Sequence, residues 1–137
     1  MYGRPQPQQE LLIVAFPDII VGVDPRTGAR VWVYRDTSIQ APVARIAIGT
    51  QVVVVGAGNV LTSLAYATGA VLWRIETQIP VDTMLVRADA IYVASTGEVA
   101  CYSHNGQFMW HDGYRGFGDG RISLGFPGQV ADADVDG

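Results

Sequence analysis

The chain has 137 residues, of which 49% are hydrophobic and 16% are charged, and its formal net charge is −4. That composition is too apolar and too weakly charged for a disordered chain, and the excess of 13 Asp and Glu over 9 Lys and Arg argues against a nucleic-acid partner. The single cysteine excludes an intramolecular disulfide, and the 16 glycines favour a turn-rich, all-β domain.

The first ten residues are rich in Pro and Gln, which predicts an N-terminal arm over 1–10. This arm has neither the apolar stretch nor the small-residue cleavage site of a signal peptide, and no segment reaches the ~18 apolar residues of a membrane-spanning helix. We therefore expect a soluble protein with no membrane partner, located in the cytoplasm or in a particle assembled there.

Three segments between residues 11 and 112 repeat one pattern, and they cover 20–32, 61–73 and 99–110. Each begins as an apolar run typical of a strand, continues into a polar turn that ends in Gly, and reaches Trp four residues after that Gly. Gly suits such a turn because it adopts positive φ without steric cost. Each segment is predicted to be a β-hairpin, and the shared positions are Gly28, Trp32, Gly69, Trp73, Gly106 and Trp110.

Further apolar runs before these hairpins predict additional strands. They cover 11–16, 43–48, 51–55, 84–86 and 90–94. A complete unit then has four strands in about forty residues, which is the size of one blade of a β-propeller. The sequence therefore predicts three four-stranded, propeller-like blades over 11–112, of which the first lacks its first strand.

The first hairpin reads Asp24-Pro25-Arg26-Thr27-Gly28 and reaches Trp32, and it resembles the repeat of quinoprotein-type (PQQ-like) β-propellers, in which D-x-x-T-G follows an apolar strand and Trp comes four residues later. The second copy keeps T-G and the Trp, and the third keeps the Gly and the Trp. The resemblance implies a propeller in which these residues pack blades together and bind no cofactor. The calcium ligands and catalytic Asp of the quinone enzymes are not identifiable, so we predict no catalytic residue, no cofactor and no enzyme.

Residues 113–137 form a Gly-rich C-terminal tail in which 121–126 alternates polar and apolar residues, the apolar ones being Ile122, Leu124 and Phe126. This segment begins eleven residues after the last Trp, the distance at which 43–48 follows the first Trp. It is therefore expected to be the first strand of a blade. The repeats then contribute three, four, four and one strands, which amounts to three blades with one divided between the two ends of the chain.

Three blades are too few to close a ring, because propellers typically have about 4–8. We expect the ring to be completed by homo-oligomerisation, with two copies giving six blades and the strand of 121–126 completing the first blade of the other copy. The alternative is an open arc of three sheets that docks on another protein.

The sequence ends in Asp132, Asp134 and Asp136 followed by Gly137, which matches the opening D-x-D-x-D-G of an EF-hand calcium loop. The later ligands of such a loop do not follow, so the hypotheses are a weak or shared Ca²⁺ site and a solvated acidic tail. His104 and His111 lack a partner at zinc-ligand spacing and are interpreted as turn residues.

The leading functional hypothesis is a non-enzymatic structural or protein-interaction module that self-assembles through its blades, such as a component of a large symmetric assembly like a virion. The alternative is a lectin-like propeller that binds a glycan or another small ligand by stacking on Trp and Tyr side chains between blades.

Overall fold

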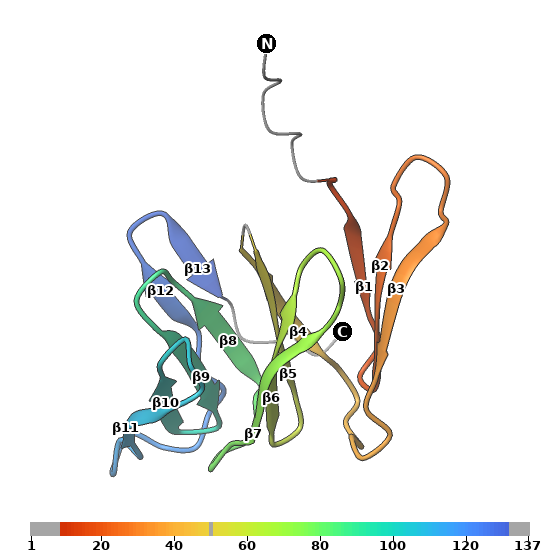
Figure 1. Ribbon diagram of the computed structural model, residues 1–137. Helices are drawn as coiled ribbons and strands as arrows, with labels where there is room; N and C mark the ends of the chain where they lie inside the picture. The colour runs from red at the N-terminus through yellow and green to blue at the C-terminus, as the bar shows by residue number, and fades with distance from the viewer. Residues whose placement is uncertain (1–8, 50, 132–137) are drawn as a thin grey trace.

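The computed structural model describes residues 9–49 and 51–131, and this part of the chain is all-β (Figure 1). Its strands form one three-stranded, two four-stranded and one two-stranded antiparallel sheet. In each sheet consecutive strands lie side by side, as in the blades of a propeller. The predicted all-β class and the propeller-like sheets are confirmed. Within the described ranges no helix is long and apolar enough to cross a membrane.

The first three sheets correspond to the three sequence repeats and are named blades I, II and III. Blade I contains β1 (Leu12–Ala15), β2 (Ile19–Val23) and β3 (Arg30–Arg35). Blade II contains β4 (Arg45–Ile48), β5 (Val52–Ala57), β6 (Val60–Ala65) and β7 (Val71–Glu76). Blade III contains β8 (Thr83–Val86), β9 (Ile91–Ser95), β10 (Glu98–Tyr102) and β11 (Phe108–Asp112). The last hairpin contains β12 (Leu124–Phe126) and β13 (Gln129–Ala131).

Blade II lies between the other two blades, which explains why its β5 strand is apolar without alternation. Val53 and Val55 belong to the core shared with blade I, whereas Val54 belongs to the core shared with blade III. Successive side chains of a strand point to opposite faces of its sheet, so a strand covered on both faces is apolar at every position. The two cores hold the three blades together as a stack of sheets (Figure 1).

Each outer hairpin carries a β-bulge directly before its Trp. The pairing of β2 with β3 shifts between Gly22 and Val23, and corresponding shifts occur between β6 and β7 and between β10 and β11. The residues left out of the pairing are Val31, Leu72 and Met109. A bulge re-aims the side chains beside it, so it sets the direction of the following indole. The sequence patterns did not predict these bulges.

The C-terminal hairpin lies where a fourth blade would begin. The inner strand β4 of blade II contacts the inner strand β8 of blade III, and β8 in turn contacts β12 and β13. The sequence predicted one strand over 121–126, but the structure has β12 from residue 124 and a second strand, β13, after a turn at Pro127-Gly128. Before this strand, the carbonyl of Ile122 accepts a hydrogen bond from the Thr83 hydroxyl of β8 (2.9 Å).

Candidate protein-interaction surfaces

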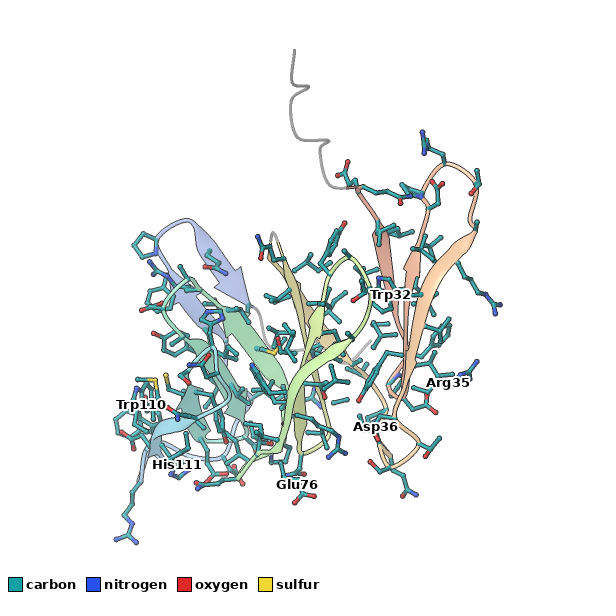
Figure 2. All side chains as sticks on the ribbon, viewed as in Figure 1. Trp32, Arg35, Asp36, Glu76, Trp110 and His111 are labelled. Atoms are coloured by element: carbon teal, nitrogen blue, oxygen red, sulfur yellow. The ribbon has the colours of Figure 1, made fainter. Side chains whose placement is uncertain are left out.

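Blades I and II are joined by an indole that lies on a glycine. A Cβ placed on Gly69 would overlap the indole of Trp32, so only Gly fits beneath that side chain, and its φ of +74° also favours Gly. The indole nitrogen of Trp32 donates a hydrogen bond to the carbonyl of Tyr66 (2.9 Å). Trp32 is consequently 8% exposed. Figure 2 shows its side chain between the two blades.

Blades II and III repeat this contact. A Cβ on Gly106 would lie 2.9 Å from the indole of Trp73, and Gly106 has a φ of +81°. The indole nitrogen of Trp73 donates to the carbonyl of His104 (2.7 Å). In both cases the acceptor is a backbone carbonyl two or three residues before the Gly. The Trp-on-Gly contact is therefore the repeated joint between successive blades.

Trp110 has the same repeat position in blade III, but its indole lies at the end of the molecule farthest from blade I (Figure 2). It is 42% exposed, and in the described part of the chain its nitrogen has no hydrogen-bond acceptor. Its aromatic neighbour is Tyr92, at 6.4 Å between centroids. The bulge residues before the three tryptophans are exposed to a similar degree, at 45%, 53% and 55%. The outer strands of the three blades are therefore exposed to a similar degree at the bulge. They differ at the Trp, because no following blade among the described residues covers Trp110.

Gly28 in blade I has the repeat position of Gly69 and Gly106, but no side chain covers it in the described structure. Its φ is +78°, close to that of Gly69 and Gly106, but a Cβ placed on it would have no atom of the structure within 4 Å. Among the described residues no indole lies over this glycine, and no described blade precedes blade I. The chain thus presents an uncovered Trp at one end and an uncovered Gly at the other.

The face of blade I that points away from blade II is apolar and open. Leu12 is 55% exposed, whereas Val53, which has the same repeat position in blade II, is 0% exposed. A hollow of about 300 Å³ runs over this face and includes Gly28. Its apolar lining is Val14, Phe16, Ile19, Val21, Val23 and Val33, with Arg30 and Arg35 at its margin.

The side chains of the predicted tail strand pack against blade III of the same chain. Phe126 packs against Tyr92 in a tilted arrangement with ring centroids 5.2 Å apart, and the guanidinium of Arg87 lies 4.0 Å from the centre of the Phe126 ring. Gln129 of β13 donates a hydrogen bond to the carbonyl of Val86 (2.8 Å). Leu124 lies in β12, and Ile122 precedes it without regular pairing.

An ion pair between blades I and II was missed from the sequence, because its members are 38 residues apart. Arg74 Nε donates to Asp36 at 2.6 Å, and Arg74 Nη2 donates to the Ser38 hydroxyl at 2.8 Å. Desolvation by burial raises the pKa of the Asp36 carboxyl, but hydrogen bonds from Ser38 and Arg74 outweigh it and leave that pKa below its usual value. The pair therefore favours the ionised carboxylate.

The two histidines lie apart in the structure, each with its own partner. His111 pairs with Glu98 at 3.1 Å, while His104 contacts the carbonyl of Arg87. Over residues 9–49 and 51–131 no three His, Cys, Asp or Glu side chains are grouped to hold a metal ion. Asp132, Asp134 and Asp136 lie outside the described residues, so the calcium hypothesis stays a prediction. Burial raises the pKa of the Cys101 thiol, which disfavours the reactive thiolate.

A larger hollow of about 480 Å³ lies between blade II, blade III and the start of the tail. Arg45 donates to the carbonyl of Asp82 (2.8 Å), and the Ser95 hydroxyl donates to the Asp82 carboxylate (2.9 Å). These lining groups bond to one another, an arrangement that favours a structural role.

Comparison with known proteins supports the propeller assignment. The sequence model of the family described as outer membrane protein assembly factor BamB matches residues 9–124. No curated protein matches the sequence. The crystal structure of BamB from Moraxella catarrhalis is 18% identical, with a TM-score of 0.65, over 92% of this chain and 44% of that one.

Two quinohemoprotein alcohol dehydrogenases also have similar structures. The enzyme ADHIIG from Pseudomonas putida HK5 is 19% identical, with a TM-score of 0.62, over 74% of this chain and 19% of that one. The enzyme from Comamonas testosteroni is 22% identical, with a TM-score of 0.62, over 76% of this chain and 19% of that one. This chain therefore spans less than half the length of each of the three structures, and the likeness shows the fold alone.

These neighbours correct one prediction. The sequence led us to predict that the chain is not an enzyme, and that prediction is wrong as an exclusion, because dehydrogenases are among the proteins that share its fold. The assembly factor shares the fold as well, so the fold by itself does not separate the two classes.

Proposed function

This chain belongs to the family of the outer membrane protein assembly factor BamB, and we propose that it acts as a protein-interaction module that binds a further copy of itself. The observation that carries the proposal is the open face of blade I. Leu12, Val14 and Val23 form an apolar surface there, and the residues at the same repeat positions in blade II are buried.

The equivalent faces of the other two blades are buried, which sets this surface of blade I apart. In blades II and III the face toward the preceding blade is covered, and Val53, Leu64, Ile91 and Val93 are each 0% exposed there. Burying apolar area contributes about 25 cal/mol per Å², so an uncovered face of this kind gains free energy by packing. Contiguous exposed apolar surfaces on soluble proteins commonly mark interaction sites. A second copy supplies a matching blade, and two copies would give six blades, within the range of about 4–8 typical of propellers.

The lectin-like alternative has weaker support. Stacking on a sugar needs an indole with an open face, but Trp32 and Trp73 lie against Gly69 and Gly106. Only the third repeat offers an exposed indole, that of Trp110, which lies beside Tyr92. A role in a large symmetric assembly stays a prediction, as does the location of the protein in the cell.

Light scattering on a sizing column, at several protein concentrations, tests the proposal. We expect the wild-type chain to exceed the monomer mass and Val14→Lys to shift it back, because burying an unpaired cation on the open face against a second copy is unfavourable. Val71→Lys is the matched control, because Val71 lies at the exposed start of β7 in blade II. A wild-type chain that stays monomeric at every concentration would contradict the proposal.

A further inference from the structure

Trp110 and Gly28 have the two repeat positions that form the contact between successive blades. Within the chain, Trp32 covers Gly69 and Trp73 covers Gly106, so the contact always runs from one blade to the next. Among the described residues, no glycine lies beneath the indole of Trp110 and no indole lies over Gly28. Trp110 on β11 and blade I, whose β2–β3 turn carries Gly28, lie at opposite ends of the described structure, so the two residues do not meet within it (Figure 1).

We propose that Trp110 of one copy docks on Gly28 of a second copy, so that the copies associate head to tail. This inference rests on the proposed function and specifies which surfaces of the two copies meet. In the two internal contacts the indole nitrogen donates to a carbonyl two or three residues before the Gly. The corresponding acceptors in the second copy are the carbonyls of Pro25 and Arg26.

Charge on the two surfaces is complementary. Asp112 lies two residues after Trp110 on β11 and so shares its face of the strand. The hollow that contains Gly28 has Arg30 and Arg35 at its margin. An acidic group on the docking face thus approaches a basic margin, an arrangement that favours this pairing of faces over two like faces.

The strand edges show what docking requires. In blades II and III an inner strand, β4 or β8, pairs with the second strand of the blade, β5 or β9. Blade I begins with the equivalent of that second strand, β1, which pairs only with β2 among the described strands. The inner-strand position that follows β8 is held by β12, which pairs with β13. Docking of blade I after blade III therefore places β1 of the second copy on the edge of β12 that β13 occupies.

Strand exchange follows from this geometry. The pairing of β12 with β13 covers three residues, from Leu124 with Ala131 to Phe126 with Gln129. The strand that would replace β13 is four residues long, Leu12–Ala15, and is anchored in a three-stranded sheet. The inferred assembly thus combines a side-chain contact at the outer strand with backbone pairing at the inner strand.

A mutant cycle on the dissociation constant of self-association tests the contact. Trp110→Ala removes the indole, and Gly28→Asn adds a side chain in the socket while tolerating positive φ. Phe117→Ala is the control for loss of an exposed aromatic residue, and Gly116→Asn is the control for the backbone, because Gly116 has a φ of +87° and nothing within 4 Å of its Cβ position. Circular dichroism and thermal unfolding confirm that each variant is folded.

We expect each of the two contact variants to raise the dissociation constant at least tenfold, and the double variant to be no weaker than either single variant, because both break one contact. The control variants should bind like wild type. If wild type, Trp110→Ala and Gly28→Asn all self-associate equally well, this inference is overturned and the proposed function still stands. Additive effects would also overturn it, because they would place the two residues in separate contacts. A monomeric wild type would overturn the proposed function itself.

Discussion

The hydroxyl of Tyr66 in blade II accepts a hydrogen bond from the backbone N–H of Leu11 at 2.6 Å and donates one to the carbonyl of the same residue at 2.9 Å. Tyr66 also supplies the carbonyl that binds the indole nitrogen of Trp32. One residue therefore fixes both the start of the first strand and the outer end of the first joint between blades.

Replacing Tyr66 with Phe should lower the free energy of unfolding by about 1–3 kcal/mol, because the buried N–H and carbonyl of Leu11 lose their partner. Urea unfolding followed by tryptophan fluorescence measures the change. Tyr114→Phe is the matched control, because the Tyr114 hydroxyl has no hydrogen bond among the described residues. Equal stability of the two variants would show that the hydroxyl of Tyr66 contributes nothing.

Gly69→Ala should cost more stability than Gly28→Ala, although both glycines have nearly the same φ. Both substitutions pay the backbone cost of an L residue at positive φ, about 1–2 kcal/mol. Only Gly69→Ala also forces the new methyl group into the indole of Trp32, for which overpacking adds about 1–3 kcal/mol. Unfolding should be measured at protein concentrations below the dissociation constant of self-association, so that no second copy covers Gly28. Identical losses would argue against the packing contribution.

The free energy of unfolding should decrease as the pH is lowered, in part because Asp36 becomes protonated. Its folded-state pKa lies below its unfolded value, so its contribution is present above the unfolded pKa of about 3.9 and is lost as the pH falls through the folded value. Asp36→Asn should remove this part of the pH dependence, and Arg74→Gln should remove only part of it, because Ser38 still binds the carboxylate. Unfolding between pH 2 and pH 6 measures the slope. An unchanged slope in Asp36→Asn would contradict the assignment.

Two truncations should have opposite effects on self-association if strand exchange occurs. Removal of 127–137 deletes β13 and frees the edge of β12, so association should tighten. Removal of 113–137 deletes β12 as well, so association should weaken. Light scattering on both chains beside wild type measures the two shifts. Shifts in the same direction would count against exchange at this edge.

The sequence predicted the hairpins well, because the Gly-to-Trp spacing and the β-branched runs are local signals. Val54 and Val55 point to different cores, and no local pattern separates them, because a strand covered on both faces is uniformly apolar. The bulge at Val31 and the pairing of Asp36 with Arg74 depend on contacts between strands or blades. The hairpin strand β13 is three residues long, too short for alternation to reveal.

The acceptors of the two internal indoles are main-chain carbonyls, and the surface beneath each indole is a glycine. The acceptor and the surface beneath the indole both belong to the main chain, so this contact constrains the side chains of the following blade only at the glycine. A substitution elsewhere in the turn that holds the glycine therefore affects this contact only through the conformation of the backbone.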